Sequence, residues 1–186
     1  MMPERRSYRI GVILLLCMLP VVDSSAATRA QRREMDRDEA LLREWLSVLP
    51  RDSGVVISRD DAHVTLRFPA VSVFDPDSSS LNAEAMGAAP VLATLKLMQR
   101  RRALSAQIAV YTDSIGGASG NQSFSDARAK ALTSSLISAG IAAPRLQSQG
   151  GGAGNALASN DTPEGRSENR RVEIAFQRAA RRAAAK

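Results

Sequence analysis

The spacing of hydrophobic residues changes several times along the chain, and each change predicts a structural element. Apolar and polar residues alternate between positions 55 and 68, with Asp60 and Asp61 interrupting the alternation, which predicts a half-buried β-hairpin. From about residue 82 to residue 102 the apolar positions follow a helical period, and Pro90 is expected either to restart or to bend this helix. This part of the chain therefore predicts two strands followed by a helix.

The second half of the chain continues the succession of strand and helix. Residues 108–111 are apolar and predict a short central strand, which a loop rich in Gly and Ser follows. Ser125 is expected to cap the next helix, which places Arg128 in its first turn. Two further strands are predicted over residues 145–148 and 169–176, with a glycine run and a polar loop between them. Strands that alternate with two helices predict an α/β (α+β) sandwich, in which two main helices pack on one face of a mixed β-sheet.

The N-terminus has the pattern of a secretory signal, which we expect to cover residues 1–27. Arginines precede an apolar run from Ile10 to Val22, and small residues follow it. Two alternatives stay open, namely a retained inner-membrane anchor and lipidation at Cys17, although Leu16 stands where lipoprotein processing requires a small residue. If the signal is removed, the mature protein has no cysteine and therefore no disulfide or thiol chemistry.

The remaining chain is expected to form one folded unit with extensions. Residues 28–53 predict a charged helical lead-in or linker, residues 54–178 the domain, and residues 179–186 a basic tail of Ala, Arg and Lys. Lys and Arg exceed Asp and Glu by 25 − 19 = 6. The arginines are scattered and only 4% of the residues are aromatic, so the composition argues against a nucleic-acid partner.

The sequence also lacks the residue combinations that catalysis requires. There is one histidine, His63, and no histidine–carboxylate spacing typical of a metal site. The glycine run at residues 150–154 is not followed by the lysine of a phosphate-binding loop. We therefore expect a binding protein rather than an enzyme, with no cofactor and no metal.

Candidate binding chemistry lies around the glycine-rich loop. Asp113 ends a predicted strand, Arg128 begins the next predicted helix, and Asn121 lies between them. The helix N-terminus is expected to add partial positive charge beside Arg128. Opposite charges around a flexible loop suit a ligand that carries both signs. The alternative is that Asp113 and Arg128 simply pair with each other across the loop.

Several motifs follow one another between residues 112 and 174, namely Thr112-Asp113, Gly116, Asn121, Ser125, Arg128-Ala129, Leu136, Gly140-Ile141, Gly150, Gly152, Asn160, Gly165-Arg166 and residues 169–174. In this order they resemble the OmpA-like C-terminal domain, a family of peptidoglycan-binding domains, and the resemblance covers roughly residues 55–177. It implies non-covalent binding of peptidoglycan through the diaminopimelate of the stem peptide, in the periplasm and in association with the outer membrane or cell wall.

The resemblance also assigns roles to individual residues. Asp113 would bind the ligand's ammonium and Arg128 its carboxylate, while Asn121 would orient the loop or bond the ligand directly. Thr112, in the same motif as Asp113, is also assigned to the ligand-binding residues, and Asp77 would make a secondary contact with the ligand.

Other positions are expected to be structural or to change the affinity. Asn169 and Arg170 are assigned structural or secondary roles, and one of Arg170 and Arg171 is expected to turn into the domain edge and bind a carboxylate. Ile115 occupies a position where relatives can have a polar contact and therefore bears on the affinity. Phe124 replaces the usual Leu and is expected to be a packing variant. Two roles remain open. The protein anchors an envelope component to the wall, or it is a periplasmic subunit of a motor or secretion machine that uses this fold mainly to contact an outer-membrane or envelope-complex protein.

Overall fold

The computed structural model describes residues 29–178. The expected signal segment 1–27 with Cys17, and the tail 179–186, lie outside the described residues. The described helices and strands are α1 (Arg29–Leu46), β1 (Val56–Arg59), β2 (Val64–Pro69), η1 (Ala70–Ser72), α2 (Ala89–Arg100), β3 (Leu104–Tyr111), α3 (Ala118–Ser138), η2 (Ala143–Arg145), β4 (Leu146–Gly152), α4 (Pro163–Asn169) and β5 (Arg171–Arg178), where η marks a 3₁₀ turn.

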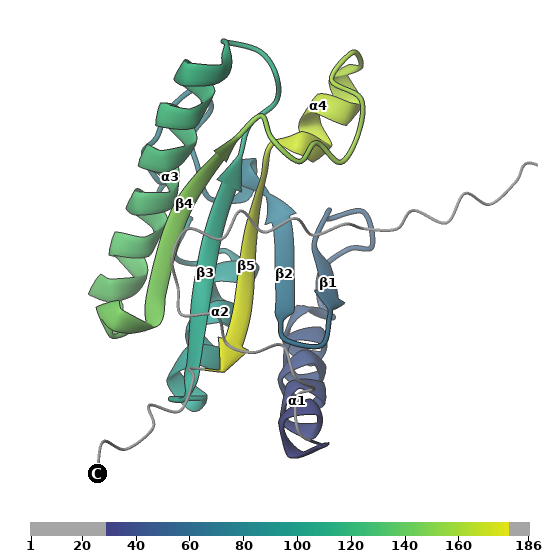
Figure 1. The fold of residues 1–186 in the computed structure, drawn as a ribbon, viewed down its shortest axis with the longest axis vertical. Helices are drawn as coiled ribbons and strands as arrows, with labels where there is room; N and C mark the ends of the chain where they lie inside the picture. Colours follow the sequence, from purple (N-terminus) through teal and green to yellow (C-terminus); the bar gives the residue numbers. More distant parts are fainter. Residues whose placement is uncertain (1–28, 179–186) are drawn as a thin grey trace, which may run out of the picture.

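The strands form one five-stranded mixed sheet in the order β1-β2-β5-β3-β4 (Figure 1). Strands β3 and β4 are parallel, and the other neighbours are antiparallel. Strands β2, β3 and β4 therefore run in the same direction, and the loops that follow them meet at one edge of the sheet. Helix α4 lies at this edge, which is the upper one in Figure 1.

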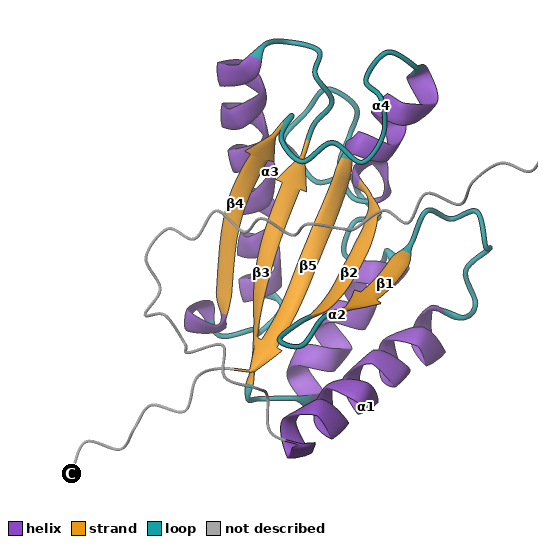
Figure 2. Cartoon of the chain, turned by 45° about the vertical axis from the view of Figure 1, so that its right-hand side comes forward, coloured by secondary structure: helices purple, strands orange, loops and turns teal. Residues whose placement is uncertain are grey.

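Alternating side chains of the inner strands build the core. Leu66, Ile174 and Ile108 are register partners on β2, β5 and β3, and all three are fully buried. Helices α2 and α3 cover this face of the sheet, as Figure 2 shows, and contribute Leu97 and Leu132 to the core. The predicted sandwich of two main helices on one face of a mixed sheet is confirmed.

Helix α1 packs against α2 and the β1–β2 hairpin. Its Leu42 is fully buried, and its Asp38 carboxylate accepts a hydrogen bond from Arg101 Nε at 2.6 Å. Leu42 and Leu46 belong to the same hydrophobic cluster as the sheet. Within residues 29–178, no helix has both the length and the hydropathy required to cross a membrane.

Two helix predictions are wrong. Helix α3 begins at Ala118 rather than at Ser125, so Ser125 and Arg128 lie inside the helix and Arg128 is not in its first turn. Residues in the predicted polar loop before β5 form the short helix α4, in which Thr162 Oγ1 accepts a hydrogen bond from Gly165 N. In both helices, tertiary or capping contacts hold polar residues of weak helix propensity in helical conformation.

Other boundaries differ by a few residues. The helix predicted from residue 82 begins at Ala89, and Pro90 lies in its first turn, where its missing N–H leaves no hydrogen bond unmade. The central strand begins at Leu104 rather than at residue 108 because Ser105 and Gln107 interrupt the apolar run without interrupting the pairing with β5.

Candidate functional site

The candidate site lies at the sheet edge where the loops after β2, β3 and β4 meet. Contacts between these loops bring the predicted site residues to one region. Arg128 bonds the loop after β2, Asp113 bonds Arg170, and Asn121 bonds the loop of Asp113. The two charges on which the sequence argument rests are both buried, since Asp113 is 9% exposed and Arg128 is 6% exposed.

The Arg128 guanidinium is fixed on one edge by two backbone carbonyls. Its Nε donates to Ser78 O at 2.7 Å and its Nη2 donates to Asp75 O at 3.0 Å. The rings of Phe74 and Phe124 lie 4.9 Å and 4.2 Å from its central carbon. Nη1 makes no hydrogen bond with any residue from 29 to 178. Two of the five N–H donors are therefore used, and the Nη1 edge is left for another acceptor.

No described carboxylate forms an ion pair with Arg128. The other buried charged side chains do pair, in Asp38–Arg101, Asp113–Arg170 and Arg171–Glu173. Burial lowers the pKa of the Arg128 guanidinium, the charge of Asp77 opposes this, and Arg170 adds to the lowering. A buried cation with only neutral partners is costly, so this position favours an anionic ligand.

Asp113 is bound on both oxygens. Its Oδ1 accepts a hydrogen bond from Ile115 N at 3.0 Å, and its Oδ2 accepts one from Arg170 Nη1 at 2.6 Å. Asp113 and Arg128 make no ion pair with each other in the described structure, so the alternative in which they pair directly is wrong. Arg170 and Arg171 both bind carboxylates, although only one was expected to do so.

Asn121 holds the loop that carries Asp113. Its Nδ2 donates to the carbonyl of Asp113 at 3.0 Å, and its side chain is buried in the first turns of α3. Gly116 and Gly117 have φ angles of 97° and 79°, which allow the sharp turn from the loop into the helix. The start of α3 therefore lies beside Asp113, and not beside Arg128 as the sequence suggested.

Asn169 joins the loop after β4 to the loop after β3. Its side chain bonds the backbone of Leu157 and Ala158, and its Nδ2 donates to Asn160 Oδ1 at 3.0 Å. The same Asn160 oxygen accepts a hydrogen bond from Ser114 N at 3.1 Å. This network sets the position of the segment that carries Asp113.

Thr112 and Asp77 complete the set of predicted residues. Thr112 is 6% exposed, and its Oγ1 has no hydrogen-bond partner among residues 29–178. Asp77 is exposed and lies on the loop whose Asp75 and Ser78 carbonyls bind Arg128. It is close enough for its charge to raise the pKa of Arg128, but the two make no ion pair.

The glycine run in β4 allows α3 to approach the sheet closely. A Cβ on Gly150 would overlap the backbone of Asp126 and Ser125 Oγ. Gly150 N donates to Asp126 Oδ1 at 2.7 Å, and Gly152 N donates to Ser125 Oγ at 3.0 Å. These contacts fix the helix that carries Asn121 and Arg128.

Sequence reasoning missed part of the site. Phe74 and Asn160 were not assigned a role, and Phe124 was interpreted only as a packing variant. The Asp75 and Ser78 carbonyls carry no sequence signal, because a backbone acceptor is present at every residue. The sequence offered a weak signal for Phe74 and Phe124, because the chain has only four Phe residues in all.

Comparison with known proteins identifies the family. The sequence profile of the OmpA family matches residues 73–170. The chain belongs to the OmpA family. Among curated proteins of similar sequence, the "Probable lipoprotein YiaD" of Escherichia coli is 36% identical over 140 residues, which are 75% of this chain and 61% of that protein. This chain therefore spans less than two thirds of the length of that relative.

Other OmpA-family relatives and solved structures extend the comparison. The "Peptidoglycan-binding protein ArfA" of Mycobacterium tuberculosis is 45% identical over 64 residues, which are 34% of this chain and 20% of that protein. The crystal structure of a putative MotB-like protein from Desulfovibrio vulgaris has a TM-score of 0.70 and 25% identity, and covers 83% of this chain and 99% of that one. The cell wall anchor of the T6SS from Pseudomonas aeruginosa, at 21% identity and a TM-score of 0.64, shares the fold over 74% of this chain and 97% of that chain.

Proposed function

We propose that this chain binds peptidoglycan non-covalently through the diaminopimelate of the stem peptide, and so attaches an envelope component to the cell wall in the periplasm. The observation that carries the proposal is the buried Arg128 guanidinium, whose hydrogen bonds within residues 29–178 go to backbone carbonyls and which lies against two aromatic rings. A planar guanidinium that is held in place by hydrogen bonds on one edge is pre-organised to bind a carboxylate on its other edge.

The free end of diaminopimelate carries an ammonium and a carboxylate on one carbon. In the proposed complex, the carboxylate binds the Nη1 edge of Arg128 and the ammonium binds Asp113. Arg170 already bonds Asp113 and acts electrostatically on Arg128, so it lies within reach of both charges of the ligand. The site would therefore recognise the pair of opposite charges rather than either charge alone.

The remaining predicted residues would support this contact. Asn121 orients the Asp113 loop through the Asp113 carbonyl. Thr112 Oγ1, which is buried without a partner among the described residues, would bond a polar group of the stem peptide. Asp77 would supply a secondary contact to the ammonium side, and Asn169 and Arg170 would keep the loops in place.

Membership of the OmpA family supports a wall-binding role, because relatives in that family include a protein named for binding peptidoglycan. The likeness to a MotB-like protein favours a second candidate, a periplasmic subunit of a motor or secretion machine. The two candidates differ in the partner that the chain holds and not in the chemistry of this site.

Sedimentation of the full chain with isolated peptidoglycan tests the proposal. The wild-type protein is expected to pellet with the wall, and Arg128→Ala or Asp113→Ala is expected to stay in the supernatant. Loss of one partner of a buried charged contact costs about 2 to 5 kcal/mol of binding free energy. Thermal unfolding of both variants would show that they are folded.

Charge-matched controls are available on the surface. Arg102 lies just before β3 and Asp61 lies in the β1–β2 turn, so both are at the edge of the sheet opposite the site loops, and both are exposed. Arg102→Ala and Asp61→Ala should therefore pellet like the wild type. Peptidoglycan with amidated diaminopimelate should bind more weakly. An amide is neutral and has one oxygen, so it cannot accept two charge-assisted hydrogen bonds from the guanidinium as a carboxylate does. Equal pelleting of Arg128→Ala, Asp113→Ala and the controls would refute the site.

A further inference from the structure

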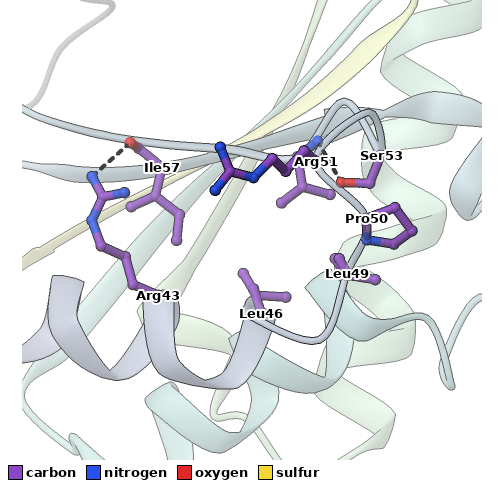
Figure 3. A pocket seen from close by; sticks show the side chains of 8 residues that line it. Arg43, Leu46, Leu49, Pro50, Arg51, Ser53 and Ile57 are labelled. Atoms are coloured by element: carbon purple, nitrogen blue, oxygen red, sulfur yellow. Dashed lines mark hydrogen bonds between the residues drawn. The ribbon is translucent and has the colours of Figure 1, made fainter.

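A second concave site lies between the end of α1 and the edge strand β1, and it shares no residue with the loops around Arg128. The cavity has a volume of about 240 Å³ and opens between the helix and the strand. Figure 3 shows the side chains that line it. Its apolar wall is formed by Leu46 at the end of α1, Leu49 in the turn that follows, Val55 just before β1, and Ile57 in β1.

Two arginines converge on the opening of this cavity, and they differ in their partners. Arg43 is fixed, since Nε and Nη2 donate to Glu39 Oε1 at 3.0 Å and 2.7 Å and Nη2 also reaches Ile57 O at 3.2 Å. Arg51 makes no hydrogen bond or ion pair with any residue from 29 to 178. Its side chain extends across the opening toward Ile57, as Figure 3 shows.

The charge around the cavity is therefore unbalanced. Glu39 neutralises Arg43, but no described acid neutralises Arg51. At the end of α1, Glu44 O and Leu46 O accept hydrogen bonds from Ser47 N and Leu49 N, and Arg51 bonds neither carbonyl. The site thus combines one unpaired guanidinium with an aliphatic wall in a small volume.

We propose that this cavity binds the C-terminal residue of a partner polypeptide that ends in an aliphatic side chain. A terminal residue carries a carboxylate and a side chain on the same carbon, which matches a guanidinium beside an apolar wall. The terminal carboxylate would bind the Arg51 guanidinium, and the side chain of the terminal residue would pack on Leu46 and Leu49. The cavity is smaller than the roughly 300 to 1,000 Å³ typical of small-molecule sites, so it suits one residue rather than a cofactor.

The edge of β1 limits the contact to the end of the partner. Because the Ile57 carbonyl is bound by Arg43, a peptide cannot pair with β1 along its whole length. The ligand therefore enters by its terminus rather than by adding a strand to the sheet.

Titration of the ¹⁵N-labelled full chain by NMR tests this site with defined probes. N-acetyl-L-leucine is expected to shift the amides of residues 46–57 in a saturable manner, and N-acetyl-L-leucinamide, which lacks the carboxylate, is expected to bind at least tenfold more weakly. Equal binding of the acid and the amide would overturn the proposal.

Variants at Arg51 separate charge from geometry. Arg51→Ala should lose at least tenfold in affinity, and Arg51→Lys should bind at an intermediate level because the planar fork is gone but the charge remains. Arg102→Ala is the control and should bind like the wild type. Arg51 is exposed and makes no hydrogen bond or ion pair with the described residues, so its substitution is not expected to disturb the fold. Unchanged affinity in Arg51→Ala would refute the site.

A further probe distinguishes a polypeptide end from a fatty acid. A pentapeptide with a free C-terminal leucine should bind more tightly than hexanoate, since hexanoate lacks the backbone amide and the branched side chain. Hexanoate binding as tightly as the pentapeptide would overturn the assignment to a polypeptide terminus.

Discussion

Arg170 Nη1 donates to Asp113 Oδ2 at 2.6 Å, so the acid proposed to meet a ligand's ammonium already has a cationic partner in the free protein. The Asp113 side chain is 12% exposed and that of Arg170 is 45% exposed. The pair therefore lies at the boundary between the buried site and solvent, where an incoming ammonium can displace or join the guanidinium.

We expect the Asp113–Arg170 pair to add little to stability. The half-exposed guanidinium is screened by water, so its coupling to Asp113 should be at most about 1 kcal/mol. A double-mutant cycle with Asp113→Ala and Arg170→Ala, measured by urea unfolding, gives this coupling directly. A coupling of several kcal/mol would mean that the pair is a structural element of the fold rather than an exchangeable contact.

Phe124 should matter for binding more than for folding. Its ring lies 4.2 Å from the Arg128 guanidinium carbon and holds one face of it, and such contacts contribute about 0.5 to 2 kcal/mol. Phe124→Leu is therefore expected to weaken peptidoglycan sedimentation by about 2- to 30-fold. Ser123→Ala, one residue away and exposed, is the control. Wild-type binding by Phe124→Leu would show that the ring does not position Arg128.

Gly150 and Gly120 should respond to alanine in opposite directions. A Cβ at Gly150 would overlap Asp126 and Ser125 Oγ, so Gly150→Ala must displace α3 and should cost about 1 to 3 kcal/mol or more of unfolding free energy. Gly120 lies in α3 with open space around it, and Gly120→Ala should stabilise the protein by about 0.5 to 1 kcal/mol. Urea unfolding of both variants measures the difference, and a tolerated Gly150→Ala would contradict the close approach.

Titration of Asp38 should lower the free energy of unfolding as the pH rises through the acid range. Burial raises the pKa of this carboxyl, and the hydrogen bond and charge of Arg101 only partly oppose the effect. The folded protein therefore keeps the Asp38 proton to a higher pH than the unfolded chain does. As the pH rises from the ordinary Asp pKa of about 3.9 to the raised pKa of the folded state, the contribution of Asp38 to the free energy of unfolding decreases.

Asp38→Asn removes that titration and should flatten the decrease in this pH range. Urea unfolding of both proteins at a series of pH values gives the difference between their slopes. Parallel curves would show that Asp38 has the same pKa in the folded and unfolded states.

The sequence predicted those helices and strands in which one face packs on the core, because their apolar residues recur with a regular period. Val64, Leu66 and Phe68 alternate with polar residues, and the structure pairs that strand with β1 in the predicted hairpin. The start of α3 could not be predicted in this way. Asn121 and Ser125 are held in the helix by bonds to the Asp113 loop and to β4, which are contacts between distant parts of the chain.

The same distinction applies to the candidate site. Asp113 and Arg128 could be selected because their types and spacing resemble a known motif. The residues that bond them could not be identified from the sequence, because Arg170 is 57 residues from Asp113 and Ser78 is 50 residues from Arg128. Pairing over such separations depends on the sheet order, which brings the start of β5 beside the end of β3.

The beginning of α1 and the loops around Arg128 lie at opposite ends of the molecule (Figures 1 and 2). If the wall is held at those loops and a partner pulls on the chain ahead of α1, tension crosses the fold nearly parallel to the strands. Such a pull must first separate α1 from its neighbours, where Leu42 is packed and Asp38 bonds Arg101. The packing of α1 would then be one of the contacts that resist the pull.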